Sequence, residues 1–123
     1  MLSSAHRLTH HSEFTAVMRS GKRAGRPRVV VHALPAGDTV LGWGDPARVG
    51  LIVSKAVGGS VVRHRVSRKL RHVMRDVVSS LPLGTSVVLR ALAAAATATS
   101  GELDADVSAA LRKLGFPRTP DSA

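Results

Sequence analysis

The stretch SKAVGGSVVRHRVSRKLRHVMR, residues 54–75, holds seven lysine and arginine side chains and two histidines, with no aspartate or glutamate. These residues are Lys55, Arg63, Arg65, Arg68, Lys69, Arg71 and Arg75, with His64 and His72 between them. Guanidinium and ammonium groups form charge-assisted hydrogen bonds with phosphate oxygens. The chemistry that this stretch predicts is therefore binding to a polyanion rather than bond cleavage.

The composition of the whole chain agrees with this prediction. The 123 residues carry 18 Lys and Arg against 8 Asp and Glu, a formal net charge of +10, and a pI near 11.8. Such a balance favours nucleic acid as the partner. No apolar run approaches the length of a spanning helix, and the first residues lack the apolar segment of a signal peptide. We therefore expect a cytoplasmic protein with no membrane partner, and the absence of cysteine excludes disulfides and thiolate metal sites.

Apolar periodicity and turn residues divide the chain into helices and strands. Ser12 is predicted to cap a short helix that ends at Gly21, and strands are expected over 26–37, 47–56 and 85–93. The basic stretch forms a long helix ended by Pro82 and Gly84, residues 93–101 form a surface connection, and 102–115 form the last helix. The α-β-β-α-β-α order predicts an α+β two-layer sandwich with a small mixed sheet. We expect one domain over 1–116 and a flexible tail over 117–123.

On a helical wheel the long helix has one apolar and one basic face. At about 100° per residue, one arc collects the apolar side chains and predicts the buried face. They are Val62, Val66, Leu70, Val73 and Val77. The cations occupy the opposite arc, where Asp76 is the only acidic neighbour. A solvated charged face is the plain alternative, but such faces usually mix signs because pairs of like charge are unfavourable. We therefore favour an RNA-binding face, with Ser60 as its helix cap and the N–H groups near Gly58 and Gly59 open to a phosphate.

Two segments resemble the bacterial ribonuclease P protein family. The segment GLIVSKAVGGSVVRHRVSRKLRHVMR is similar to the family signature, a Gly-Leu-x-Val-Ser-Lys-Lys strand followed by Gly-Asn-Ala-Val, an Arg-Asn-Arg motif and a basic helix. The segment RLTHHSEFTAVMRSGKR resembles the family's opening, and the resemblance extends from Arg7 to Leu114. Arg63 and Arg65 of the triplet are kept. The departures are His64 for Asn, Gly59-Ser60 for Asn-Ala, Ala56 for the second Lys, Ser67 for a basic residue, and His72 for a frequent Glu.

This resemblance implies a fold of the ribonuclease P protein type, shared with the second domain of a small-subunit ribosomal protein. It also implies a subunit of an endoribonuclease that removes the 5′ leader of precursor tRNA. The RNA subunit would cleave with bound Mg²⁺, so the protein would hold no catalytic residue and no tightly bound metal. The partners would be the catalytic RNA and precursor tRNA, with no obligate protein partner evident.

The resemblance further assigns two sets of RNA-binding residues. The set facing the catalytic RNA is Lys55, Arg63, His64, Arg65, Arg68, Lys69, Arg71 and Arg75. The leader would lie in a cleft between the first helix and the sheet, lined by Phe14, Met18 and His32. Since Phe14 alone is aromatic there, we expect leader binding to depend more on charge than on base stacking. A position in the hydrophobic core is the alternative for Phe14.

Other candidate sites are weaker. A metal held by His6, His10 and His11 lacks a nearby carboxylate, and Trp43 is more simply explained by packing on its own turn. Glu102, Asp104 and Asp106 are read as the acidic first turn of the last helix. Two other functions stay open: a general RNA-binding or ribosomal-type protein, and a protein-only nuclease with His64 as general base. The first would bind many RNAs without selectivity, and the second would cleave without an RNA partner.

Overall fold

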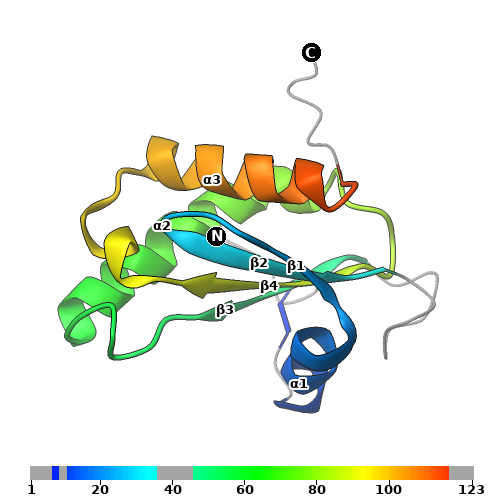
Figure 1. Cartoon of the computed structure of the whole chain (residues 1–123), viewed down its shortest axis with the longest axis horizontal. Coiled ribbons are helices and arrows are strands. Elements are labelled where there is room, and N and C mark those ends of the chain that lie inside the picture. The colour runs from blue at the N-terminus through cyan, green and yellow to red at the C-terminus, as the bar shows by residue number, and fades with distance from the viewer. Residues whose placement is uncertain (1–6, 9–10, 36–45, 117–123) are drawn as a thin grey trace.

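The computed structural model describes residues 7–8, 11–35 and 46–116, and the expected tail over 117–123 lies outside them (Figure 1). The helices are α1 (His11–Ser20), α2 (Ser60–Val78) and α3 (Ser100–Lys113), with a short 3₁₀ helix, η2 (Ala93–Thr97). The strands are β1 (Lys22–Gly25), β2 (Val29–Leu34), β3 (Arg48–Ile52) and β4 (Ser86–Ala91). The predicted order of elements is confirmed, with β1 as an addition that its short, basic sequence KRAG did not predict.

The four strands form one mixed sheet in the order β1-β2-β4-β3. β2 pairs antiparallel with β1 and β4, whereas β3 runs parallel to β4. Parallel neighbours need a long crossover connection, and α2 with its flanking turns supplies it. The N-terminal segment adds a bridge at the outer side of β3, where Leu8 N donates to Val49 O at 3.0 Å. The α+β class and the mixed sheet are therefore as predicted.

The two faces of the sheet are covered differently. α2 and α3 lie side by side over one face and α1 lies across one end of the other face (Figure 1). Val29, Val31 and Ala33 of β2 point into the main core under α2 and α3. The alternate residues face α1, where Leu34 and Val88 join Leu8 and Val17 in a second cluster. The second layer of the predicted sandwich is thus α2 and α3, and α1 adds a partial layer beyond the sheet.

Two predicted helix caps are wrong. Ser12 lies inside α1, which begins at His11, and Ser60 is the first residue of α2 rather than its cap. The residue that caps α2 is Gly59, which has no side chain to offer a hydrogen bond. The predicted surface connection is also partly wrong, because it contains η2 and buries Ala95 completely in the core.

The prediction that Glu102, Asp104 and Asp106 together form the acidic first turn of α3 is wrong. α3 begins at Ser100 with Thr99 as its cap: Thr99 Oγ1 accepts from Glu102 N at 3.1 Å, and Glu102 Oε1 accepts from Thr99 N at 2.9 Å. The hydrogen bond from the Thr99 backbone, and then the charge of Arg28, lower the pKa of the Glu102 carboxyl. Only Glu102 of the three therefore lies in the first turn.

Asp106 lies a further turn along α3 and is buried. Its carboxylate accepts from Arg28 N and from Arg28 Nη1, each at 3.3 Å. Arg28 also reaches Glu102 Oε2 at 3.2 Å. This arginine thus fixes α3 to the start of β2, and a buried carboxylate needs such a partner.

We predict that Gly21→Ala destabilises the fold while Gly25→Ala does not. A Cβ at Gly21 would lie 2.5 Å from Val17 O and 2.7 Å from Ala33 O, both backbone atoms, whereas at Gly25 it would meet nothing within 4 Å. Overpacking of this kind costs about 1–3 kcal/mol. Urea unfolding of the two variants checks this, and equal free energies of unfolding would contradict the close approach of α1 to β2 at Gly21.

Candidate nucleic-acid interface

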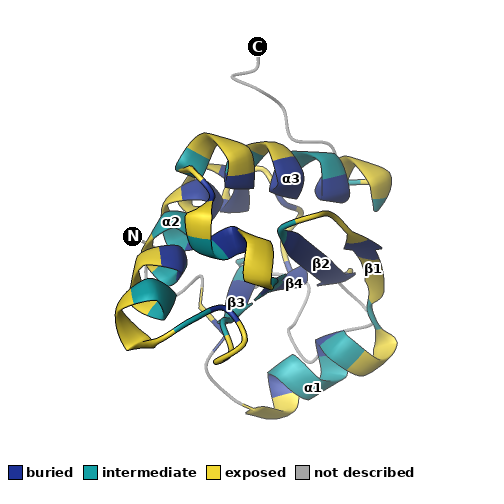
Figure 2. Ribbon diagram, turned by 60° about the vertical axis from the view of Figure 1, so that its left-hand side comes forward, coloured by how far each residue is buried: buried dark blue, intermediate teal, exposed yellow. Residues whose placement is uncertain are grey.

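α2 exposes its cations because its apolar residues are buried on the other side. Val66, Leu70, Val73, Met74, Val77 and Val78 are buried, and the exposed side of the helix faces away from the sheet (Figure 2). The predicted buried arc is therefore confirmed, with Val62 only half-buried at its N-terminal end. The burial of one helix face thus fixes the direction in which the other face points.

The predicted RNA-binding residues fall into two groups by exposure. Lys55, His64, Arg65, Arg68 and Arg75 are exposed, and Arg63, Lys69 and Arg71 are half-buried. We call the side chains of α2 in this set, Arg63 to Arg75, the basic face of α2. The ion pairs among the described residues, Arg28–Glu102, Arg28–Asp106 and Arg48–Glu13, use none of these side chains. Their charge is therefore not neutralised by these ion pairs.

The N-terminal end of α2 carries a hollow of about 500 Å³ lined by Ser60, Val61, His64, Arg65 and Arg68. Val61 leaves 76% of its surface exposed there, which is unusual for a large apolar side chain in the middle of charged neighbours. The first turn of α2 contains no acidic residue and has no side-chain cap. The hollow thus offers helix N–H groups and guanidinium groups to a phosphate, and an apolar side chain to a base.

The turn before α2 depends on Gly58. Its φ is 155°, and a Cβ at this position would lie 2.9 Å from Cβ and Cγ1 of Val62. The turn itself is held by Val57 N donating to Ser54 O at 3.1 Å and by Gly58 N donating to Lys55 O at 3.2 Å. This turn sets the position of Lys55 relative to the helix.

Lys69 and Arg65 contact the protein itself. Lys69 Nζ donates to Ala98 O at 2.8 Å, and Arg65 Nη2 donates to Ala96 O at 3.4 Å. Ala98 directly follows η2 and directly precedes Thr99, the cap of α3. The short bond gives Lys69 a structural part in joining α2 to the start of α3, which its place in a basic helix did not predict.

The three residues predicted for the leader cleft share the face of the sheet that α1 covers. Phe14 and Met18 of α1 pack against the second cluster, and His32 lies on β2 directly opposite Val88 of that cluster. Phe14 fills the space above Gly50, where a Cβ would collide with its ring. Its ring also lines a hollow of about 320 Å³ with Arg7 and Arg71. Phe14 is therefore part of the packing of the fold and borders an open hollow, and its contact with the leader stays a prediction.

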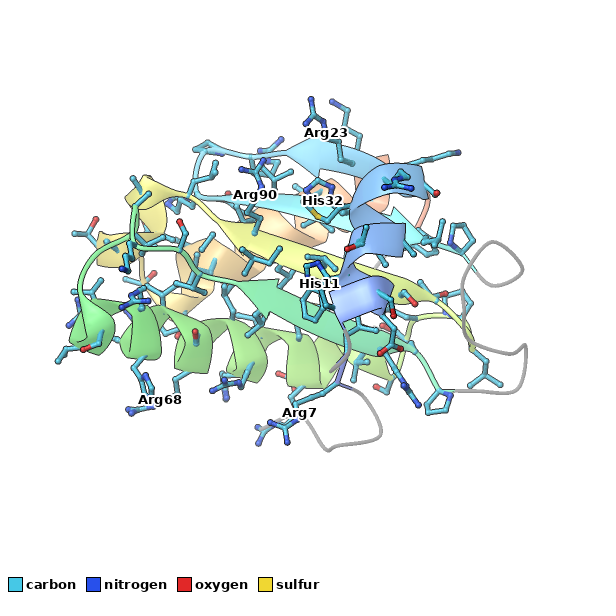
Figure 3. The ribbon with its side chains drawn as sticks, turned by 90° about the horizontal axis from the view of Figure 1, so that it is seen from below. Arg7, His11, Arg23, His32, Arg68 and Arg90 are labelled. Carbon is cyan, nitrogen blue, oxygen red and sulfur yellow. The ribbon has the colours of Figure 1, made fainter. Side chains whose placement is uncertain are left out.

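His32 lies between two arginines that sequence reasoning missed. Arg23 is its cross-strand partner on β1, and Arg90 is on the neighbouring strand β4 (Figure 3). Burial first, and then the charges of Arg90 and Arg23, lower the pKa of the His32 imidazole. His32 Nε2 and Arg90 Nε are buried without a hydrogen-bond partner in the described structure. His32 is thus a buried imidazole beside two guanidinium groups, and its Nε2 is not open to solution in this structure.

The carboxylates do not assemble a hydrolytic site within the described residues. Glu13 pairs with Arg48 at 3.4 Å, and Glu102 and Asp106 pair with Arg28. Asp76 and Asp104 line a small hollow of about 170 Å³ with His72, but the described ranges contain no group of three or more His, Cys, Asp or Glu arranged to hold a metal. His64, the candidate general base, shares its hollow with no carboxylate among the described residues. The histidines His6 and His10, and Trp43, lie outside the described residues.

Nor does any helix in the described part of the chain combine the length and the apolar character that crossing a bilayer requires.

Comparison with known proteins gives one consistent result. Residues 2–115 match the family described as Ribonuclease P. The ribonuclease P protein component of Corynebacterium diphtheriae is 51% identical over 121 residues, which cover 96% of this chain and 100% of the relative. That of Rhodococcus opacus is 50% identical over 116 residues, 93% of this chain and 92% of the relative.

Solved structures agree in fold. The RNase P protein of Staphylococcus aureus superposes with a TM-score of 0.76 at 20% identity, over 90% of this chain and 96% of that one. The RNase P protein of Thermotoga maritima gives a TM-score of 0.68 at 18% identity, over 89% and 94%. The sheet and its helices are therefore those of this structural group.

We predict different effects for two neighbouring cations of α2. Lys69→Met should lower the free energy of unfolding by about 1–2 kcal/mol, because it removes a charged hydrogen bond to Ala98 O. Arg68→Met should leave stability unchanged and reduce the slope of log affinity for RNA against log salt by about 0.7–0.9, as expected for one lost phosphate contact. Urea unfolding and salt titration of both variants separate these roles. Identical behaviour of the two variants would contradict the assignment.

We predict that His32 makes the stability of the protein depend on pH. Because the pKa of His32 is lowered in the folded state, the unfolded chain takes up a proton first as the pH falls below about 6.5. The free energy of unfolding should then decrease, by up to about 1.4 kcal/mol per pH unit, until the folded protein is protonated as well. His32→Gln should remove this component. Parallel pH profiles of the two proteins, measured by urea unfolding between about pH 7 and pH 5, would disprove the prediction.

Proposed function

The chain belongs to the ribonuclease P family, and on that premise we propose that it is the protein subunit of an endoribonuclease that removes the 5′ leader of precursor tRNA. The observation that supports the proposal most is the position of two candidate RNA-binding surfaces on opposite sides of β3. The basic face of α2 lies on one side, and the face that holds Phe14 and His32 lies on the other. A subunit that contacts a catalytic RNA and a substrate at the same time needs two such surfaces.

The basic face of α2 would bind the catalytic RNA. Its exposed arginines form a row along one side of a helix that has 19 residues, with the hollow of Val61 and His64 at one end. Neutralising phosphates with such a row releases counterions, and this supplies affinity without reading sequence. The hollow at the end of the row could take an unpaired base beside its phosphate, which would fix the position of the protein along the RNA.

The face beneath α1 would bind the leader. A single strand combines phosphates with exposed bases, and Phe14 offers a ring to stack on while Arg7 and Arg71 flank the same hollow. Arg90, whose charge lies beside His32, would add positive charge from the sheet. In this arrangement the protein orients the leader and supplies charge, and mature tRNA, which has no leader, loses these contacts.

Cleavage would be the work of the RNA subunit, which would supply Mg²⁺ to polarise the scissile phosphate. The protein's own part is electrostatic. Its described carboxylates are largely committed to arginines of the fold, and the basic face brings positive charge to two polyanions that otherwise repel each other.

The test is 5′ processing of a precursor tRNA at low magnesium by the RNA subunit alone, by the RNA with protein, and by the protein alone. We expect the protein to stimulate cleavage by the RNA and to cleave nothing by itself. Cleavage by the protein alone, abolished in His64→Ala, would instead establish a protein nuclease. Tight binding to unrelated RNAs without stimulation would leave a general RNA-binding protein.

A further inference from the structure

A second basic cluster lies along β1, at the edge of the sheet away from α2. Its members are Arg19 in the last turn of α1, Lys22 and Arg23 of β1, and Arg26 just after it. All four are exposed, and the segment from 19 to 28 contains no acidic residue. None of the four forms an ion pair with another described residue. Figure 3 shows Arg23 at one edge of the sheet and Arg68 beyond the other.

Strand register connects this β1-edge cluster to the face beneath α1. Arg23 pairs with His32, and His32 pairs with Val88, which in turn pairs with Gly50 under Phe14. These four residues form one transverse row on the same face. Gly25, Val30, Arg90 and Ile52 form the next row. The basic side chains therefore follow a path of three strand spacings, about 14 Å, from the hollow at β3 to the cluster at β1.

Part of this path is not covered by any described helix. α1 crosses only one end of the face, and the part of the sheet that carries Arg90 lies to one side of it (Figure 3). Along the path His32 Nε2 and Arg90 Nε are buried without partners, so the fold has left two polar groups unsatisfied between two exposed sets of cations. Solvent does not reach these two atoms, so a bound strand could pair with them only after a movement of the side chains, and the exposed cations along the path would meet its phosphates first.

Cations on an edge strand have a simpler explanation, because Lys and Arg there prevent edge-to-edge aggregation. This explanation accounts for Lys22, which alternation places on the α3 side of the sheet. It does not account for Arg23, which points to the face that holds His32. The pKa of the His32 imidazole is lowered first by burial, then by the charge of Arg90, and then by the charge of Arg23.

We propose that the β1-edge cluster binds the distal part of the precursor's leader, upstream of the nucleotides that lie beneath α1. This inference rests on the proposed function. Since the catalytic RNA would lie along α2, which packs against β3, the nucleotides near the cleavage site lie on the β3 side. A strand that continues over His32 and Arg90 then leaves the protein across β1, where Arg23 and Arg26 meet its phosphates. The cluster makes precursors with long leaders the preferred substrates.

The test compares Arg23→Gln/Arg26→Gln with Arg112→Gln/Lys113→Gln, a control that removes two exposed cations from the end of α3. Each protein is assembled with the RNA subunit, and the affinity for precursor tRNA is measured as the leader is lengthened one nucleotide at a time. For the wild type and the control, affinity should rise with leader length and then level off. The Arg23/Arg26 variant should match them for short leaders and lose the gain for long ones. Its salt slope with long leaders should fall by about 1.4, the value for two phosphates of a single strand.

Each other result has a definite meaning. Equal loss of affinity at every leader length would overturn the proposal, because the cluster would then contact the tRNA body or the catalytic RNA. The same loss of affinity in the Arg112/Lys113 variant would show that the effect results from a lower net charge and not from the β1-edge cluster. Normal dependence on leader length in a variant that aggregates would leave edge protection as the only role. If the wild-type protein fails to stimulate processing even with the shortest leader, the proposed function itself is wrong.

Discussion

The structure depends on the two-sided burial of β2 and β4. Because successive side chains of a strand point to opposite faces, Val29, Val31 and Ala33 build the main core, while Val30, His32 and Leu34 face the other way. All six residues of β2 are buried, and so are five of the six of β4. A shift of register by one residue would exchange the two sets and place His32 in the main core. The position of α2 outside one face, and of the residues proposed to bind the leader on the other, follows from this alternation.

The charged side chains divide into those paired within the fold and those exposed on its surface. Three carboxylates serve the fold: Asp106 holds Arg28 at the start of β2, Glu13 holds Arg48 at the start of β3, and Glu102 caps α3. Asp76 is the only acidic residue exposed on α2 and β1, and the other charged side chains exposed there are basic. A protein with this distribution keeps its internal ion pairs and presents its remaining positive charge outward, where only a partner can neutralise it. The apolar contacts of Val66, Leu70 and Val73 stabilise α2 against the repulsion along its outer face.

Some elements of the fold and of the candidate site could be predicted from the sequence, and others could not. The buried arc of α2 is predicted correctly because a 3.6-residue period is visible in one segment. The run of valines locates β2, although the strand is Val29–Leu34, shorter than the predicted 26–37. Strand β1 was missed because KRAG has neither apolar alternation nor β-branched residues, and its pairing with β2 stabilises it instead. Arg23 and Arg90 were missed as neighbours of His32 because the sequence of a single strand does not determine how it pairs with the next strand. The role of Lys69 was missed because its acceptor, Ala98 O, belongs to a 3₁₀ connection far along the chain.

Arg71 belongs to both surfaces. It is part of α2, and its side chain lines the hollow beneath Phe14 at the outer side of β3. If the two surfaces bind the catalytic RNA and the leader as proposed, their occupation would not be independent, because an arginine oriented by one phosphate presents a different geometry to the next. In thermodynamic terms the two RNAs would then be linked ligands: whatever factor the first contributes to the affinity for the second, the second contributes to the first. Arg71 is the side chain through which the proposed function would couple the enzyme RNA to its substrate.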